Sequence, residues 1–235
     1  MLISSLPLTM QSWAAPQLSV APKFSGNFNL YSMCDLIEEL RLPEAPFPSP
    51  EDVYKAIADA DPKVTAKCSL GASLSSYHDE ADNEGRFRGT KICDPVVNQP
   101  YDVIIASTEE EESLSFTEDE LGQFPMRDTD LSGPGMTAQV ALSESDHPGV
   151  VAASGYIKFV RVWAKKDEKG ELLEVFEVYL NLDISFELSF KLGGRRFRPN
   201  FPEETHALAF WAIRVGKDEE RGDWFSEESS ESDFD

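Results

Sequence analysis

A run of alternating residues at positions 176–192 constrains this fold more than any other feature of the chain. Every even-numbered position is apolar, whereas the odd-numbered positions are mostly polar or charged. Successive side chains of a β-strand point to opposite faces, so the pattern predicts a strand with one buried face and one face in water or against a polar interface. At about 3.3 Å per residue it would span roughly 56 Å, about three times a usual strand. We therefore expect a break near residues 181–185, with the halves in different sheets or one half reaching a neighbouring molecule.

Shorter patterns predict further strands. Residues 150–165 and 172–192 are joined by a polar turn that ends in glycine, which predicts a hairpin. Both faces of 150–165 carry apolar residues, so this strand is expected to be central. The long connections favour an antiparallel β-sandwich, jelly-roll-like, over a βαβ fold. The remaining predicted strands are residues 64–74, 86–92, 101–106, 136–142 and 206–215.

The sandwich is expected over residues 63–216, preceded by an arm with two short helices over residues 1–62. Residues 1–32 contain three prolines and scattered aromatic residues, and they lack the basic start of a signal peptide. The first helix is predicted at residues 33–40, and the second begins after Ser49, which is suited to cap it. A third, very short helix is expected near residues 117–121, within a long excursion between strands.

The charge of the chain limits its partners. It carries 43 acidic and 21 basic residues, for a formal net charge of -22. Such a field disfavours direct nucleic-acid binding and anionic membranes and favours basic proteins, although it also serves solubility. No stretch is long and apolar enough to predict a membrane span. Cys34, Cys68 and Cys93 lie far apart, as reduced thiols of a cytoplasmic or nuclear protein do.

The sequence contains no motif for catalysis or for a cofactor, so we predict a protein that is not an enzyme and uses no cofactor. The three histidines lack metal-binding spacing. His78, beside Asp79 and Glu80, is an alternative cation ligand, and the acidic residues at 109–112 and 128–130 are alternative calcium sites. Consecutive carboxylates do not have the alternating ligand spacing of a calcium loop, which favours a solvated surface.

One local basic group stands out from the acidic chain. It consists of Arg195, Arg196 and Arg198, with Phe197 between them. Guanidinium groups bind carboxylates and phosphates through paired hydrogen bonds. We expect this group to contact an acidic segment of the same chain or of a neighbouring copy; the alternative is a plain surface loop.

The tail, residues 217–235, is predicted to be disordered because it is strongly acidic. Its aromatic residues stand among acids, as in short interaction motifs, and two serines lie three residues before an aspartate, as in substrates of acid-directed kinases. A purely solubilising tail is the alternative. The predicted interaction residues are Trp224, Phe225 and Phe234, and the predicted phosphorylation sites are Ser230 and Ser232.

Together, the proline-rich arm, the acidic loops and the long strands resemble the β-sandwich coat proteins of small icosahedral viruses. The resemblance implies a capsid component of the virion that self-associates through its sandwich and arm. Such coats often have a basic arm that neutralises the genome, whereas residues 1–32 contain only Lys23 as a basic residue. The resemblance thus implies an outer part, or a coat whose genome contact another protein makes. The alternative function is an intracellular acidic module that binds or chaperones a basic protein partner.

Overall fold

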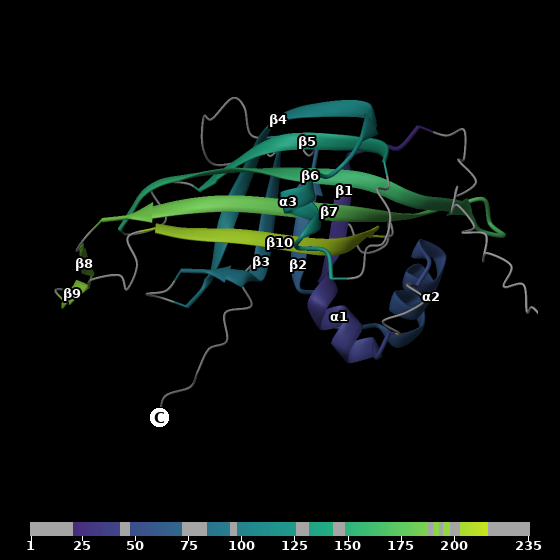
Figure 1. The fold of residues 1–235 in the computed structure, drawn as a ribbon, viewed down its shortest axis with the longest axis horizontal. Helices are drawn as coiled ribbons and strands as arrows, with labels where there is room; N and C mark the ends of the chain where they lie inside the picture. The colour runs from purple at the N-terminus through teal and green to yellow at the C-terminus, as the bar shows by residue number, and fades with distance from the viewer. Residues whose placement is uncertain are drawn as a thin grey trace, which may run out of the picture.

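The computed structural model describes residues 21–42, 48–71, 84–94, 98–125, 132–142, 149–187, 190–192, 195–197 and 203–215. Eight antiparallel strands close into a barrel in the order β1-β10-β7-β6-β5-β4-β3-β2 (Figure 1). A separate two-stranded sheet holds β8 (Phe190–Leu192) and β9 (Arg195–Phe197). The barrel strands are β1 (Gly26–Ser32), β2 (Ala66–Leu70), β3 (Gly85–Cys93), β4 (Pro100–Leu114), β5 (Gly133–Leu142), β6 (Val150–Lys166), β7 (Leu172–Phe186) and β10 (Glu203–Arg214).

The closed barrel shows that the predicted jelly-roll-like β-sandwich is wrong. β1 pairs with β10 on one side and with β2 on the other, so the eight strands form one closed sheet. This closing strand lies within residues 1–32, which we had assigned to an arm. Only Phe28 and Leu30 of β1 reach the interior core, too few positions for an alternation to stand out. A sandwich and a barrel both bury one face of every strand, and only the pairing partners separate them.

Apolar side chains fill the interior of the barrel. Phe28 lies at its centre, with ring centroids 5.4 Å from Phe176 and 5.5 Å from Phe159. An eight-stranded barrel is just wide enough for side chains to occupy its interior. The large, fully buried side chains include Phe28, Leu30, Leu70, Phe87, Ile92, Tyr101, Ile105, Met136, Phe159, Phe176 and Phe210.

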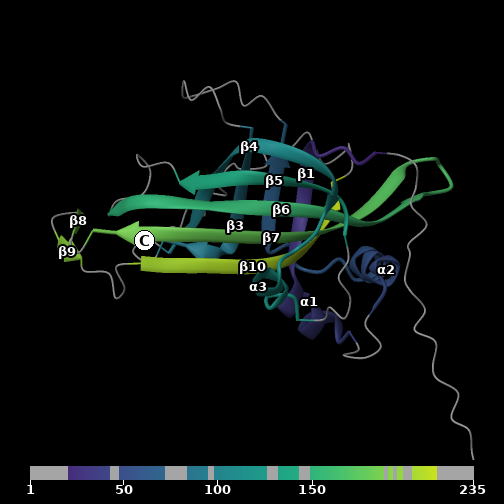
Figure 2. The same ribbon diagram turned by 45° about the horizontal axis from the view of Figure 1, so that its top comes forward.

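The long alternating run forms β7 without a break at residues 181–185. β7 pairs with β6 along one edge and with β10 along the other, up to Phe186. The predicted break was therefore placed too early, and the run leaves the barrel only after Phe186. Figure 2 shows the β8–β9 hairpin beyond the end of β7. Long neighbours on both edges support the full length of β7.

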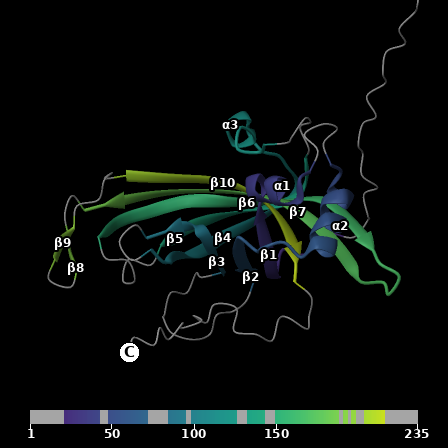
Figure 3. The same cartoon turned by 90° about the horizontal axis from the view of Figure 1, so that it is seen from below.

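A second apolar cluster covers part of the outside of the barrel. It joins Val175 and Tyr179 of β7 to Trp211 of β10 and to helices α1 (Met33–Leu40) and α2 (Pro50–Ala60). The outward face of β7 is therefore covered over its first half, at Val175, Glu177 and Tyr179, whereas Asp183 further along the same face is exposed, as predicted. Figure 3 shows α3 (Glu118–Leu121) over the same wall, with β2 and β3 on the other side of the barrel.

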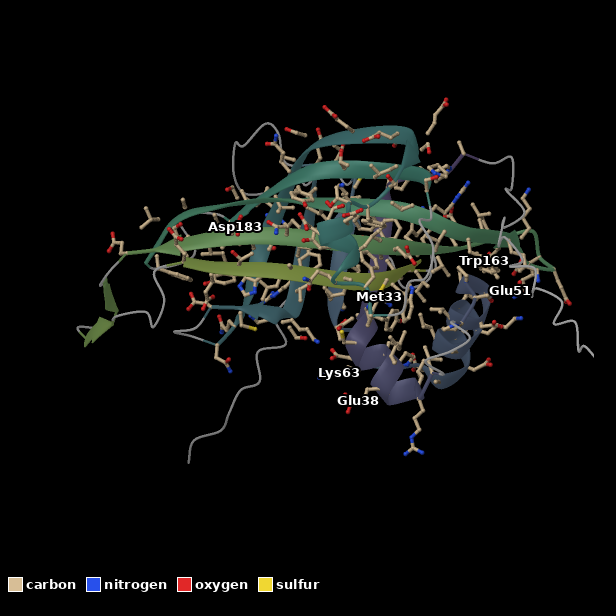
Figure 4. The ribbon with its side chains drawn as sticks, in the orientation of Figure 1. Met33, Glu38, Glu51, Lys63, Trp163 and Asp183 are labelled. Atoms are coloured by element: carbon tan, nitrogen blue, oxygen red, sulfur yellow. The ribbon has the colours of Figure 1, made fainter. Side chains whose placement is uncertain are left out.

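A β-bulge places Trp163 in this outer cluster. The pairing of β6 with β7 shifts between Arg161 and Trp163, which moves Trp163 from the inward to the outward face. The ring of Trp163 then lies 5.3 Å from that of Tyr54 on α2, near Glu51 (Figure 4). Ser49 caps α2 as predicted, because its hydroxyl accepts a hydrogen bond from the Asp52 backbone N–H.

Candidate functional site

The second half of β4 is a free strand edge in the part of the chain that the structure describes. β3 pairs with β4 only as far as Ile105, whereas β5 accompanies β4 to Leu114. Ser107 has a positive φ of 52°, and the register with β5 shifts just after it, so β4 bends there. The residues beyond the bend therefore present one edge of their backbone without a described strand beside it.

Four consecutive glutamates, Glu109–Glu112, occupy this edge. All residues from 107 to 113 are exposed, although side chains alternate between the two faces of a strand. The carboxylates are therefore accessible on both faces and beside the free backbone edge. We call residues 108–113 the acidic edge. The sequence predicts a strand only as far as residue 106 and an excursion over the glutamates, because four charged residues in a row hide the alternation of a strand; β4 in fact continues to Leu114.

The acidic edge is held in place at both ends. At its start, the backbone N–H of Thr108 donates to the Glu84 carboxylate at 2.8 Å, and the Thr108 hydroxyl donates to the same group. These hydrogen bonds lower the pKa of Glu84 below its ordinary value. At its end, Leu114 packs into the outer apolar cluster. Gly135 makes this possible, since a Cβ there would lie 2.6 Å from the Leu114 Cβ and 2.7 Å from the Phe159 carbonyl oxygen.

A free edge of this kind has two physical consequences. Charged residues on an edge strand prevent pairing with another copy of the same edge, because like charges would meet. The same charges, next to unpaired backbone N–H and C=O groups, favour a basic segment in extended conformation. The acidic edge therefore disfavours pairing with a second copy of itself and favours pairing with a positively charged strand.

A buried ion cluster closes one end of the barrel interior. Glu174 of β7, with a side chain only 1% exposed, accepts hydrogen bonds from Arg161 at 3.3 Å and from Arg214 at 3.2 and 3.3 Å. The Arg214 guanidinium lies 4.8 Å from the centre of the Phe28 ring and donates to the carbonyl oxygens of Lys23 and Ser25. The cluster fixes the segment that enters β1, which is a structural role.

A sequence signal for this cluster existed. Arg161, Glu174 and Arg214 each continue the inward-facing series of their strand, two positions beyond an aromatic or small apolar residue. A charged residue at the end of an inward-facing series indicates a buried charge, which needs a partner of opposite charge inside the protein. The sequence alone does not show that three such ends meet, because that requires the neighbours of each strand.

A second carboxylate, Glu120, attaches α3 to the outside of β6. It accepts hydrogen bonds from the Tyr156 hydroxyl at 2.8 Å, from Lys158 Nζ at 2.9 Å and from the Thr117 backbone N–H at 2.7 Å. Burial opposes the ionisation of Glu120, but the bonds from Lys158, Thr117 and Tyr156 outweigh it and lower its pKa. This contact holds the chain that follows the acidic edge.

Polar groups also gather around Tyr101, near the start of β10. Burial raises the pKa of Tyr101, and the charges of Asp94 and Glu204 add to this effect. His206 Nε2 lies 3.6 Å from the Glu204 carboxylate. Burial raises the pKa of Cys93, whose thiol donates to the Thr90 carbonyl oxygen at 3.2 Å, so this thiol is not activated as a nucleophile.

The predicted site residues are only partly described. Arg195 and Arg196 lie on β9, opposite Leu192 and Lys191 of β8. All three cysteines are free. Within the described ranges, no group of three His, Cys, Asp or Glu side chains is arranged to hold a metal ion. The remaining predicted residues lie outside the described part of the chain: His78, Asp79, Glu80, Asp128, Asp130, Arg198, Trp224, Phe225, Ser230, Ser232 and Phe234.

Comparison with known proteins gives no relative: no family model, no curated protein and no solved structure matches this chain. Among the described residues, no helix has the length and apolar character needed to cross a membrane. The resemblance to viral coat proteins and the expected location therefore stay predictions.

Proposed function

We propose that this protein is a non-enzymatic binding module that holds a basic, extended segment of another protein along its acidic edge. The observation that carries the proposal is the set of four exposed glutamates, Glu109–Glu112, on a strand whose outer edge no described strand occupies. The net charge of -22 attracts basic partners towards the whole molecule.

The packed interior supports a function on the outside of the barrel. Side chains from every barrel strand meet in one interior core, and most of them are fully buried. A larger barrel encloses ligands in its interior, whereas here aromatic rings such as Phe28 and Phe159 take up that space. Binding to the outer edge requires no rearrangement of this core.

The geometry also indicates what kind of partner fits. Backbone hydrogen bonds along the edge require an extended segment, and the carboxylates on both faces select lysine or arginine at successive positions. Each exposed ion pair contributes about 0.2–1 kcal/mol and weakens with salt. Binding is therefore the sum of several weak contacts and depends strongly on ionic strength.

We prefer a module that binds a basic protein to a self-associating coat protein, for a physical reason. That expectation depended on a two-sheet sandwich, and the structure is a closed barrel instead. The acidic edge, moreover, repels the same edge of a second copy. Light scattering measures whether the chain self-associates. A large symmetric assembly of the chain alone would count against the binding module and in favour of a coat protein.

The proposal is tested with a fluorescent peptide as long as the acidic edge, with four successive lysines between two threonines, titrated with the full chain. We expect binding at low ionic strength that weakens at physiological ionic strength. Replacing all of Glu109–Glu112 with glutamine should weaken binding about tenfold, which corresponds to about 1.4 kcal/mol from four exposed pairs.

A matched control removes the same charge elsewhere. Glu38, Glu39, Asp59 and Glu168 are exposed acids on α1, α2 and the β6–β7 turn, and their amide replacements lower the net charge equally. This control variant should bind almost as tightly as the original chain. Equal weakening in both variants would show that only overall charge matters, and the acidic edge would not be the site.

A further inference from the structure

One carboxylate beside the acidic edge stands where a bound segment would end. Glu84 directly precedes β3, and its backbone N–H donates to the Ile105 carbonyl oxygen at 2.9 Å. Ile105, paired with Gly85, is the last residue of β4 that β3 accompanies. Glu84 therefore lies on the side of β4 that β3 occupies, in line with β3, just before the acidic edge begins at Thr108.

The side chain of Glu84 is fixed against the first residue of the acidic edge. The backbone N–H and the hydroxyl of Thr108 both donate to Glu84 Oε2, the N–H at 2.8 Å. In a paired strand, such an N–H donates to a backbone carbonyl of the neighbouring strand. The carboxylate thus takes the first acceptor position of that neighbour, and a group already held in place loses little freedom when a partner binds.

Glu84 keeps its negative charge for a partner. Both donors of Thr108 are neutral, and their hydrogen bonds hold the pKa of Glu84 below its ordinary value, so the carboxylate is ionised at neutral pH. A carboxylate offers about four acceptor positions, and both bonds from Thr108 fall on one oxygen. Arg86, the next cation along β3, forms an ion pair with Asp102 at 3.3 Å. Glu84 can therefore accept a cationic side chain without giving up its bonds to Thr108.

The four glutamates of the acidic edge cannot by themselves fix the direction of a bound segment. Glu109–Glu112 are like residues, so a row of lysines meets equivalent carboxylates in either direction. β4 runs antiparallel to both of its neighbours, β3 and β5. A segment that continues the line of β3 in the same sense has its C-terminal end beside Glu84 and its N-terminal end towards Leu114. Glu84 therefore makes the two ends of the acidic edge different.

We propose that Glu84 is a specificity residue of the acidic edge, which selects segments that run antiparallel to β4 and carry a lysine or arginine at their C-terminal end. The cationic side chain at that end contacts Glu84, whereas a free C-terminal carboxylate there is repelled by it. The selected segment is therefore an internal stretch of its protein that continues past the edge. This inference rests on the proposed function and adds a direction and a register to it.

A double-mutant cycle between the chain and the peptide tests this contact. The lysine–threonine peptide, with an amidated C-terminus, and two forms in which glutamine replaces the first or the last lysine are titrated against the full chain and its Glu84→Gln variant. Glutamine can still accept both hydrogen bonds from Thr108 but carries no charge. The variant should bind the original peptide and the form without the first lysine about threefold more weakly, as expected for one exposed ion pair. Both chains should bind the form without the last lysine equally tightly.

The matched control is Glu38→Gln, which removes the same charge from an exposed position on α1 and should change each affinity by less than about 1.5-fold. Equal weakening of all three peptides by Glu84→Gln would overturn the proposal, because Glu84 would then only support the edge. Dependence on the first lysine in place of the last would overturn it by showing a parallel segment. Binding that ignores Glu84 overturns this inference alone, whereas no binding to either chain overturns the proposed function with it.

Discussion

Arg214 on β10 and Glu174 on β7 make a two-point contact inside the end of the barrel, with Nε and Nη2 of the arginine 3.3 and 3.2 Å from one carboxylate oxygen. Their strands are hydrogen-bonded neighbours, and Arg161 reaches the same carboxylate from the other neighbour of β7. One carboxylate thus joins three consecutive strands and, through Arg214, the segment before β1. This joint ties the end of the barrel to the segment that enters β1.

Replacing Glu174 with glutamine should destabilise the fold by about 3–5 kcal/mol, because Arg161 and Arg214 would lose the buried carboxylate that they share. Denaturant titration measures this loss as a lower midpoint. Glu187→Gln removes an equivalent charge from an exposed position at the end of β7 and should change stability by less than about 0.5 kcal/mol. Equal midpoints for the two variants would show that the cluster does not hold the barrel end.

Glu120→Gln should lower stability at neutral pH by about 1–3 kcal/mol, since Lys158 loses its counter-charge. The folded-state pKa of Glu120 is below its ordinary value, so its contribution is complete above the unfolded pKa and is lost as the pH falls through the folded pKa. The difference between variant and original should therefore shrink in acid. A difference that is as large at pH 3 as at pH 7 would contradict the assigned ion pair.

Gly135→Ala should destabilise the protein by about 1–3 kcal/mol, because the new Cβ would collide with the Leu114 side chain and the Phe159 carbonyl. The collision lies where β4 and β5 meet β6, so the acidic edge should also become more mobile. Thermal unfolding measures the first effect and limited proteolysis the second. Gly122→Ala, at a residue with helical φ of -59°, should have a much smaller effect.

The three cysteines should react with a thiol reagent in a fixed order. Cys34 is exposed on α1, Cys93 is partly buried, and Cys68 is fully buried in the barrel interior, where burial raises its pKa. Reaction requires an accessible thiolate. Cys34 should react first and Cys68 only on unfolding, as mass spectrometry of labelled peptides would show; early labelling of Cys68 would contradict the packed interior.

Strands and helices could be predicted from the sequence, whereas the closure of the sheet could not. The alternation of β7 and the Ser49 cap of α2 are local patterns, and the structure contains both elements. Closure depends on the pairing of β1 with β10, residues nearly the whole chain apart. No local pattern records such a partner, so the same strands fitted a sandwich equally well.

The candidate site illustrates a second limit. Glu109–Glu112 were visible as an acidic run, but their value as a site depends on the end of the β3 pairing at Ile105 and on the bend at Ser107. A one-residue bulge leaves no mark in the sequence, so alternation alone would place Trp163 on the same face as Phe159, whereas the bulge turns it to the outer cluster. Charge and burial patterns could therefore be predicted from the sequence. The place of these residues relative to the neighbouring strands could not.

Amide hydrogen exchange of the full chain, with and without the lysine–threonine peptide, tests the central claim most directly. Amides on the free side of the acidic edge have no described strand to protect them, and a segment that pairs with this edge would provide acceptors. We predict that the peptide slows exchange at residues 108–113 and leaves β2 and β3 unchanged. Binding that slows exchange elsewhere, or not at all, would contradict a binding site on the edge of β4.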